Sequence, residues 1–422
     1  MRLSSIAVLA HAAFADDSLP AALATLLNTE PDYPPPASVP VNWNAPWQPS
    51  NAADAVASNG RPLGTSFEPQ RPAVQDTFTR EGPPQPAFPP PPAAQPSAAA
   101  NAVRSQAAKV ASASVTVPST CRPARSTELA VVTLISSNEG YPAGALAISA
   151  ALEVLDSALR RIALVTPSVN SGIRELLHSA AWEVREVPEI MCNQMLGDKV
   201  TADRYDLGAE YQAKRAKWLA TCTKFHAWNL PFLRKVIFLD ADTLVLRPID
   251  SLVDHPSAFA AAPDSFPADQ FNSGVMVIEP SRATFDALVE WNRVNGTAEG
   301  GDQCLLNEFY GEWFYGAWDD PTAGKLPWIM NVGAGHHEAF RTLSRMQSRD
   351  ESVIVHFVGG ESKPWLFMVL KFQGLEDKIP AGVRKLTHAW DQMYWLAKTN
   401  RVCAGTLTDD EKWQARGLLE GV

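Results

Sequence analysis

The most informative segment of the sequence is Lys235-Val-Ile-Phe-Leu-Asp240-Ala-Asp242-Thr-Leu-Val-Leu-Arg247. Its apolar run Val236–Leu239 is typical of a strand that is covered on both faces. The two aspartates that follow are in an i, i+2 relation, so on extended backbone they point to the same side and can converge on one hard cation. An isolated pair of this kind more often caps a turn. The apolar strand before the pair makes the metal-binding interpretation more specific.

Strands and helices alternate on both sides of this segment. Before it, the sequence predicts strands at 129–135, 162–166 and 182–187 and helices at 144–160, 173–181 and 214–230. After it, the sequence predicts strands at 259–262, 274–279 and 353–357, helices at 283–295 and 302–310, and a helical tail from 381 to 422. This order predicts an α/β fold with a parallel sheet flanked by helices. In such sheets ligands bind at the carboxyl ends of the strands.

The first third of the chain has a different composition. Of the 422 residues, 34 are proline, and most of these precede residue 128. Residues 16–127 are rich in Pro, Ala and Ser and bury too little apolar surface to offset their conformational entropy, so we expect a disordered linker. Residues 1–15 resemble a secretory signal peptide ending in Ala13-Phe14-Ala15, with an alanine-rich disordered start as the alternative. The predicted organisation continues with a globular domain at 128–400 and a C-terminal tail at 401–422.

Charge and cysteine content limit the class of protein further. The formal net charge of −10 argues against broad binding to nucleic acid. No apolar run reaches the roughly 18 residues of a transmembrane helix. The five cysteines are odd in number and widely spaced, which favours buried free thiols, with one disulfide as the alternative in a secreted protein. The location stays open: the secretory pathway or Golgi lumen if the signal peptide is real, and otherwise the cytoplasm.

Four further motifs accompany the Asp-Ala-Asp segment. They are Val132-Thr-Leu-Ile-Ser-Ser-Asn-Glu-Gly-Tyr141, Phe271-Asn-Ser-Gly-Val275, Gly300-Gly-Asp-Gln303 and His356-Phe-Val-Gly-Gly-Glu-Ser-Lys-Pro-Trp365. Taken together in this order, they make residues 128–365 resemble the glycogenin-like branch of glycosyltransferase family 8. The resemblance implies the GT-A fold, which binds nucleotide-diphospho-sugars, and a reaction that retains the anomeric configuration. The first 127 residues lie outside the resemblance.

The resemblance implies a metal and diphosphate site. His356 would be the third protein ligand beside Asp240 and Asp242, and this mixed oxygen and nitrogen set suits Mn²⁺, with Mg²⁺ as the alternative. Lys363 would hold the β-phosphate of the donor. One of two glycines would let the backbone approach that phosphate, and Ala241 would line the donor site between the two aspartates. The candidate glycines are Gly359 and Gly360.

The rest of the donor site is also implied by the resemblance. The uridine pocket would be lined by Leu134, Ser136, Asn138 and Tyr141, with Tyr141 stacking on uracil; packing of Tyr141 in the core is the alternative. Two basic residues lie before the central strand. Arg215 would reach the diphosphate, and Lys224 would reach the sugar or the phosphates. The alternative is that they belong to a solvated surface, as basic helical residues usually do.

The sugar itself would contact the residues Asn272, Ser273, Asp302 and Gln303. Asp302 and Gln303 would lie beside the anomeric carbon, where an acidic side chain stabilises developing positive charge. Asp302 also suits the first turn of a helix. With Lys224 they are the candidate catalytic residues. Retention leaves two routes open: front-side attack, and double displacement using Asp302 or Gln303.

The expected function is metal-dependent transfer of a hexose, expected to be glucose, from a UDP-sugar to an acceptor hydroxyl. Glycogenin glucosylates its own tyrosine, but the corresponding stretch Leu326–Phe340 contains no tyrosine. A separate acceptor, which could be a glycan, a polyol or a protein, is therefore expected, and the protein is a candidate homodimer. The alternatives are a galactosyl transfer to a polyol like that of galactinol synthases, and a catalytically silent UDP-sugar-binding or scaffold protein.

Overall fold

The computed structural model describes residues 126–193, 219–265, 269–297, 301–346, 351–359, 362–399, 401–403 and 406–422. All of these belong to the same compact unit. The predicted signal peptide and nearly all of the predicted linker lie outside the described residues. So do two candidate site residues, Arg215 and Gly360.

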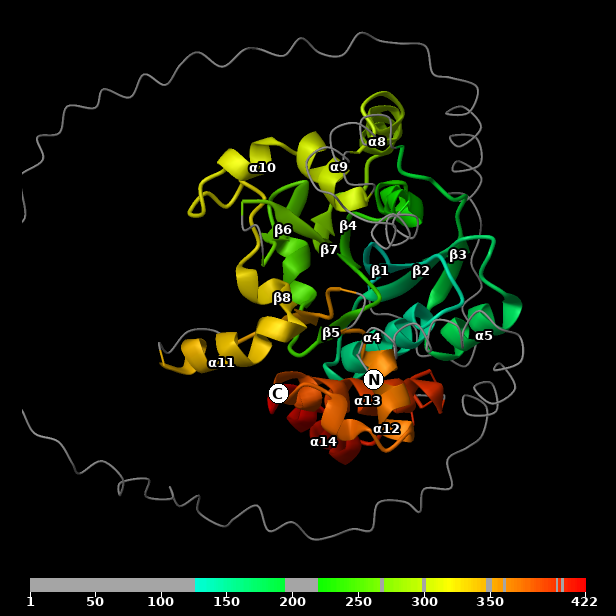
Figure 1. The fold of residues 1–422 in the computed structure, drawn as a ribbon. Helices are drawn as coiled ribbons and strands as arrows, with labels where there is room; N and C mark the ends of the chain where they lie inside the picture. Colours follow the sequence, from blue (N-terminus) through cyan, green and yellow to red (C-terminus); the bar gives the residue numbers. More distant parts are fainter. Residues whose placement is uncertain are drawn as a thin grey trace, which may run out of the picture. The chain divides into compact units, whose positions relative to one another are not determined.

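A six-stranded sheet forms the centre of the described part (Figure 1). Its order is β3 (Glu183–Glu186), β2 (Arg160–Val165), β1 (Leu129–Ile135), β4 (Lys235–Leu239), β7 (Phe271–Ile278) and β6 (Phe259–Pro263). The first four strands are mutually parallel, as predicted, whereas β7 runs antiparallel to both β4 and β6. The short connection from β6 to β7 has no room for a crossover helix, so β7 runs against the direction of the other strands in the predicted, mainly parallel sheet.

A second, three-stranded sheet continues from the central one. Its order is β5 (Thr243–Val245), β9 (Ile354–His356) and β8 (Val332–Gly333). The register pairs Thr243 with His356 across the antiparallel β5 and β9. This pairing brings His356 beside the Asp240-Ala241-Asp242 turn.

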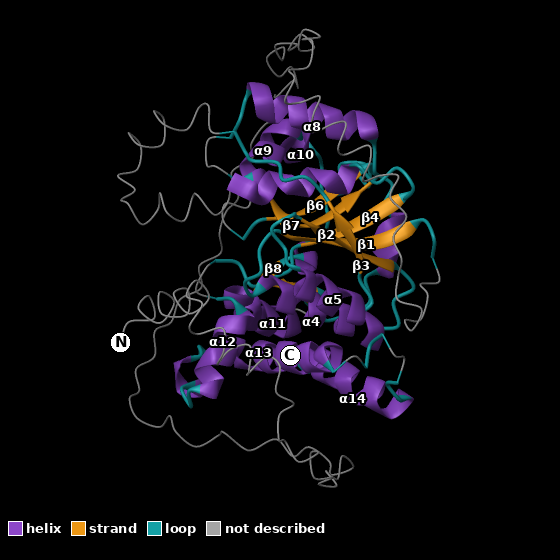
Figure 2. Cartoon of the chain, turned by 90° about the vertical axis from the view of Figure 1, so that its right-hand side faces the viewer, coloured by secondary structure: helices purple, strands orange, loops and turns teal. Residues whose placement is uncertain are grey.

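Helices cover both faces of the central sheet (Figure 2). One face carries α8 (Arg282–Val294), α9 (Asp302–Phe309) and α10 (Glu312–Tyr315); the other carries α4 (Tyr141–Val154), α5 (Ser171–Ser179), α11 (His337–Met346), α12 (Pro364–Phe372), α13 (Ala381–Lys398) and α14 (Asp409–Glu420). The 3-10 helices are η1 (Leu219–Trp228), η2 (Asp250–Asp254), η3 (Trp328–Met330), η4 (Ala334–His336) and η5 (Glu376–Lys378).

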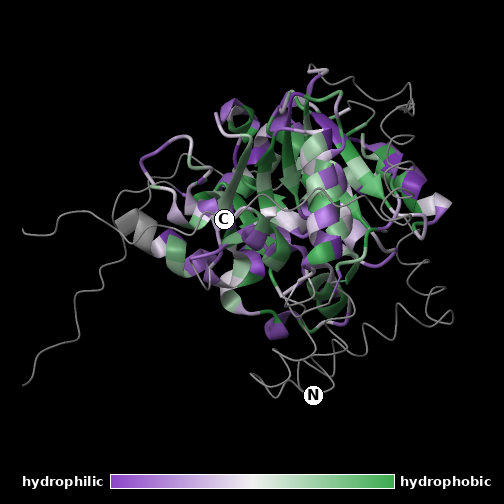
Figure 3. Cartoon of the chain, turned by 90° about the horizontal axis from the view of Figure 1, so that it is seen from above, coloured by the Kyte–Doolittle hydropathy of each residue, from purple (hydrophilic) through white to green (hydrophobic). Residues whose placement is uncertain are grey.

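Alternate residues of the strands enter two separate hydrophobic cores. On β1, Val131 belongs to the core under α4 and α13, while Ala130 and Val132 belong to the core under α8 and α9. Burial of both faces explains the continuous apolar runs in the sequence. Figure 3 shows the central strands as mainly hydrophobic and the surrounding helices as mixed. Within the described residues, no helix is both long enough and apolar enough to cross a membrane.

Two predicted helices differ from the structure. The helix expected at 144–160 ends at Val154, because Asp156 adopts a left-handed conformation (φ 56°) and the chain then turns into β2. Arg160 lies at the start of that strand and pairs with Glu183, with an N–O distance of 2.6 Å. The helix expected at 214–230 is, in its described part, the 3-10 helix η1. Apolar spacing could not distinguish the two helix types, since most of η1 is buried.

The prediction of buried free thiols was wrong for three cysteines. Cys192 and Cys222 form a disulfide whose Cα atoms lie 5.2 Å apart, and Cys403 is also disulfide-bonded. The Cys304 thiol donates to Glu308 Oε1 at 3.6 Å. Spacing along the chain does not show which cysteines meet in space, so only the fold reveals this pairing.

Candidate active site

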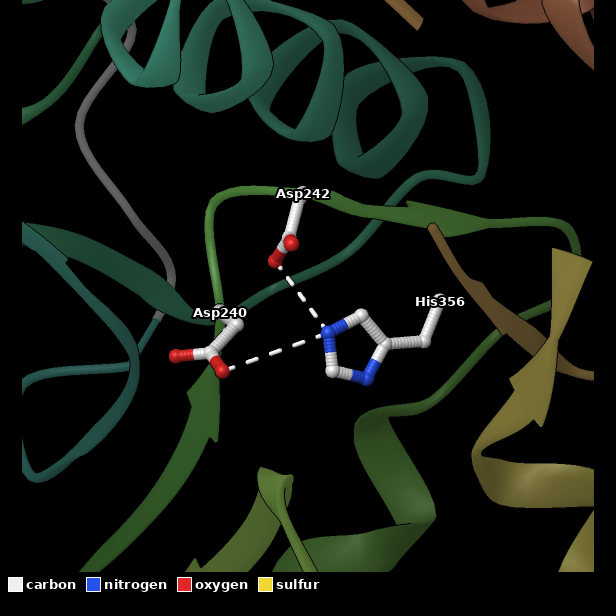
Figure 4. Close-up of side chains that lie close together, drawn as sticks. All are labelled: Asp240, Asp242 and His356. Atoms are coloured by element: carbon white, nitrogen blue, oxygen red, sulfur yellow. Dashed lines mark ion pairs between the residues drawn. The ribbon is translucent and has the colours of Figure 1, made fainter. Parts of the chain in front are cut away.

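Three candidate metal ligands converge where the two sheets meet (Figure 4). Asp240 directly follows β4, Asp242 precedes β5, and His356 is the last residue of β9. One ligand atom from each lies within 4.8 Å of the others. His356 Nε2 is 3.2 Å from Asp242 Oδ1 and 4.0 Å from Asp240 Oδ2. Two carboxylates and an imidazole thus face one small volume.

Hydrogen bonds behind His356 fix which ring nitrogen faces the carboxylates. Its Nδ1 lies 3.0 Å from Asn331 Oδ1, and Asn331 Nδ2 donates to Asn272 Oδ1 at 2.8 Å. Because the Asn331 amide nitrogen is engaged with Asn272, its oxygen accepts from the imidazole, which places the proton on Nδ1. Nε2 is then left with a lone pair directed at the aspartates. This is the arrangement of a metal-ligating histidine, so the residues fit a divalent cation.

Lys363 lies on the other side of Asp242. Its Nζ contacts Asp242 Oδ2 and donates to the carbonyl oxygen of Phe357 at 2.7 Å. Burial alone would raise the pKa of Asp242, but the positive charge of Lys363 outweighs it and holds that pKa well below its usual range. Nearby, Gly359 has a φ of +90°, a conformation that favours glycine. The predicted phosphate-binding residues Lys363 and Gly359 thus lie beside the candidate metal ligands.

Lys224 is a buried cation between two carboxylates. Its Nζ lies 2.9 Å from Asp240 Oδ1 and 2.8 Å from Asp302 Oδ2, and it donates to Ser273 Oγ at 3.3 Å. Burial would lower its pKa, but Asp240 and Asp302 outweigh that effect and raise the pKa above its ordinary value. The side chain is only 7% exposed, so it is not part of a solvated helix face.

The start of α9 supplies the two other candidate catalytic residues. Asp302 is the first residue of this helix, and its backbone N–H donates to Thr221 Oγ1 at 3.1 Å. The Gln303 side chain is held at both ends: its Oε1 accepts from the backbone of Ser273 at 3.3 Å, and its Nε2 donates to Asp264 Oδ2 at 2.7 Å.

Asp264 and Asn331 are members of this network that sequence reasoning missed. Asp264 also accepts a 3.3 Å hydrogen bond from Asn272 Nδ2. It directly follows β6, which runs in the same direction as β4 because both are antiparallel to β7. Asp264 therefore lies at the same sheet edge as Asp240. A polar residue at the end of a predicted strand was the available signal for Asp264; Asn331 had no comparable one.

The residues expected to bind the base lie after β1. Tyr141 begins α4, is 37% exposed, and makes an edge-to-face contact with Trp365 at 5.0 Å between ring centroids. Asn138 donates to the carbonyl of Ser168 at 3.0 Å and accepts from the backbone of Asn170 at 2.9 Å. It thereby connects the loops that follow β1 and β2.

Two further predicted base-pocket residues flank this connection. The carbonyl of Ser136 accepts from Ser168 Oγ at 3.2 Å, and Leu134 packs against the core under α8 and α9.

A glycine allows α4 to approach the metal-ligand turn closely. A Cβ on Gly144 would overlap the carbonyl oxygen of Ala241, the buried residue between the two aspartates. Helix α4 therefore lies directly against the Asp-Ala-Asp turn, and this explains the small residue at position 144.

The chain is similar in sequence to several known proteins and in fold to a solved structure. Over 55% of its length, the chain is 35% identical to glycogenin-1 of Caenorhabditis elegans and covers 49% of that protein. It is 30% identical to UDP-glucuronate:xylan alpha-glucuronosyltransferase 1 of Arabidopsis thaliana, over 56% of this chain and 32% of that one. Among solved structures it matches the glycosyltransferase GlyE of Streptococcus pneumoniae, with 18% identity and a TM-score of 0.41, over 64% of this chain and 63% of that one.

The chain spans about a third to two thirds of the length of the glycogenins that it matches. Its mainly parallel sheet flanked by helices agrees with the predicted GT-A fold. The model of one family, described as glycosyl transferase family 8, matches residues 132–368, which is more than half of the chain. The chain therefore belongs to glycosyl transferase family 8.

Proposed function

We propose that this protein is a metal-dependent, retaining glycosyltransferase that moves a hexose from a UDP-sugar to an acceptor hydroxyl. The observation that supports this most directly is the convergence of the Asp240, Asp242 and His356 ligand atoms next to the Lys224–Asp302 ion pair. Side chains suited to a cation, a diphosphate and a sugar thus occupy one sheet edge. Family membership supplies the reaction class for this arrangement.

The charge balance of the network explains why a cation is needed. Four carboxylates and two ammonium groups give a formal charge of about −2, which repels a diphosphate. These groups are Asp240, Asp242, Asp264, Asp302, Lys224 and Lys363. Asp240, Asp242 and His356 would hold a divalent cation, with Mn²⁺ suiting the mixed donor set and Mg²⁺ as the alternative. Such a cation, when bound, neutralises charge on the leaving diphosphate.

The protein side chains then divide into two groups by position. Lys363, beside Asp242, supplies positive charge on the phosphate side. Lys224 Nζ lies 2.8 Å from the Asp302 carboxylate and holds it in place, and a fixed carboxylate at the sugar stabilises positive charge that develops on the anomeric carbon. Gln303 and Asn272 each donate a hydrogen bond to Asp264, and this holds their side-chain amides in place for the sugar hydroxyls.

Two retaining routes are compatible with these positions. In front-side attack, the leaving phosphate oxygen takes the proton of the acceptor. In double displacement, Asp302 or Gln303 forms a covalent glycosyl-enzyme. Mass spectrometry of enzyme quenched during turnover distinguishes them, because only the second route adds a hexose mass to the peptide that begins α9.

We further propose that the acceptor is a separate molecule. The stretch Leu326–Phe340, which has no tyrosine, forms η3, β8, η4 and the start of α11 and contributes Asn331 to the site. Glucose is the proposed donor sugar. The names of the relatives include both glycogenin and a UDP-glucuronate-dependent enzyme, so the donor must be tested directly.

The test offers UDP-glucose, UDP-galactose and UDP-glucuronate, with Mn²⁺, to the full-length protein together with a glycan, myo-inositol or no added acceptor. We expect labelled product on an added acceptor and no label on the protein after denaturing electrophoresis. Label on the protein would contradict a separate acceptor, and galactosyl-inositol would identify the polyol alternative. Donor binding without turnover, equal in wild type and Asp302→Asn, would show a silent binding protein.

A further inference from the structure

A disulfide lies beside the Lys224–Asp302 pair. Cys222 is a residue of η1, two positions before Lys224, and it is bonded to Cys192 in the segment that follows β3. Both cysteines are buried: Cys222 is 0% exposed and Cys192 is 3% exposed. The disulfide therefore joins the element that carries Lys224 to a second part of the chain.

The helix η1 needs such support because of its type. It is a 3-10 helix of ten residues, whereas 3-10 helices longer than about four residues are uncommon, since their hydrogen bonds have poor geometry. The segment before Cys192 runs alongside it: Cys192 N–H donates to the Leu219 carbonyl at 2.6 Å, and Ile190 N–H donates to Thr223 Oγ1 at 3.0 Å. Contacts from outside the helix thus hold it in place.

The segment around Cys192 is itself fixed to α8. Asn193 N–H donates to Asn292 Oδ1 at 2.8 Å, and Asn292 Nδ2 donates to the Met191 carbonyl at 2.9 Å. Asn292 is buried in α8. The disulfide therefore connects η1, through the segment around Cys192, to α8.

On its other side, η1 positions the start of α9. Thr221 Oγ1, one residue before Cys222, accepts from the Asp302 backbone N–H at 3.1 Å. Lys224 Nζ contacts the Asp302 carboxylate at 2.8 Å. A shift of η1 would therefore move Lys224 and release Asp302 together.

We propose that Cys192 and Cys222 are positioning residues for the transfer reaction, and that the enzyme is fully active only while their disulfide is intact. This rests on the proposed function. Reduction adds two electrons and two protons to the disulfide and gives two thiols, while dithiothreitol, the reductant, is oxidised to its cyclic disulfide. The buried thiols no longer hold η1 against the Cys192 segment, so Lys224 and Asp302 lose their fixed positions.

The expected effect separates catalysis from nucleotide binding. Asp240 and Asp242 lie in the turn between β4 and β5, His356 is the last residue of β9, and Lys363 directly precedes α12. The disulfide joins none of these segments. Because Lys224 also contacts the metal ligand Asp240, UDP affinity should change, but by less than kcat. Misplacement of a catalytic group by about 1 Å can cost about 10²-fold, so kcat should fall by at least tenfold.

The experiment measures turnover of the donor by the full-length protein in its oxidised, dithiothreitol-reduced and reoxidised forms, with UDP affinity from calorimetry. A Cys403→Ser variant shows whether the disulfide formed by Cys403 contributes. A Cys304→Ser variant is the control for the Cys304 thiol. We expect kcat to fall on reduction, to recover on reoxidation, and to be low and insensitive to reductant in Cys222→Ser. Hydrogen exchange of the 219–228 amides should speed up on reduction, while that of β1 stays slow.

Unchanged kcat and unchanged exchange in the reduced protein would overturn the inference. Equal loss of kcat, UDP affinity and β1 protection would also overturn it, because that pattern reports general unfolding. If the oxidised wild type turns over no donor, the proposed function fails instead. Even then, hydrogen exchange of the 219–228 amides that did not change on reduction would overturn the positioning role of the disulfide.

Discussion

Gly274→Ala is a sensitive test of the arrangement around His356. A Cβ at this position would lie 2.6 Å from His356 Nδ1 and 2.9 Å from Asn272 Oδ1, whereas ordinary contact begins at 3.4 Å. The backbone of Gly274 cannot retreat easily, because its N–H donates to Asn272 and its carbonyl accepts from Asp240 N–H at 2.8 Å. The imidazole must therefore move by nearly 1 Å, and its bond to Asn331 breaks.

The magnitude follows from this displacement. Loss of a partner behind a metal ligand typically lowers metal affinity by about 10 to 100-fold, which is about 1.4 to 2.8 kcal/mol. Overpacking in a buried site lowers the free energy of unfolding by about 1–3 kcal/mol. Calorimetric titration with Mn²⁺ and denaturation with urea measure the two effects separately.

The matched control is Gly417→Ala in α14, where an added Cβ meets nothing within 4 Å. This variant should keep the wild-type Mn²⁺ affinity and gain about 0.5–1 kcal/mol, because alanine is the better helix former. If Gly274→Ala bound Mn²⁺ within twofold of the wild type, the proposed role of His356 Nε2 as a ligand would be refuted.

Three further changes test other parts of the structure. Lys224→Met leaves the buried Asp302 and the partly buried Asp240 without their cation, so urea denaturation of the metal-free protein should show a loss of about 3–5 kcal/mol. A loss below about 1 kcal/mol would contradict the ion pairs. Burial lowers the pKa of His226 to about 4 from its ordinary 6.5, so the folded protein binds fewer protons than the unfolded chain between these values. The free energy of unfolding should therefore be highest above pH 6.5 and fall by about 3 kcal/mol towards pH 4. In pH-dependent denaturation, His226→Gln should make this fall smaller. An equal fall in the variant would refute the lowered pKa of His226. Removing the disulfide in a double Cys192→Ser, Cys222→Ser variant should cost about 3–4 kcal/mol for a sequence separation of 30, and equal denaturation midpoints would contradict this.

Much of the central sheet could be predicted because its strands are buried on both faces. The strand Leu129–Ile135 has the predicted bounds, since an apolar run ends there at Ser136, Ser137 and Asn138. Strand direction was less accessible. The antiparallel β7 has the same apolar composition as a parallel strand, and only the short connection from β6 indicated the reversal.

The candidate site divides in a similar way. Asp240 and Asp242 could be identified from their spacing after a strand, and the resemblance pointed to His356. The pairing of His356 with Thr243 depends on a second sheet that no local pattern predicted. Asn331 and the Cys192–Cys222 disulfide were missed because they depend on contacts between segments far apart in the chain.

In the proposed function, the Asp240, Asp242 and His356 group holds a cation that the transfer reaction requires. The rate of UDP release from UDP-sugars tests this requirement when it is measured for wild type and Asp242→Asn, first after EDTA treatment and then during titration with Mn²⁺. We expect the EDTA-treated wild type to be inactive, Mn²⁺ to restore its activity with saturation, and Asp242→Asn to stay at least about 10²-fold slower at every Mn²⁺ concentration. Equal rates in the two proteins, or full activity of the wild type in EDTA, would contradict it.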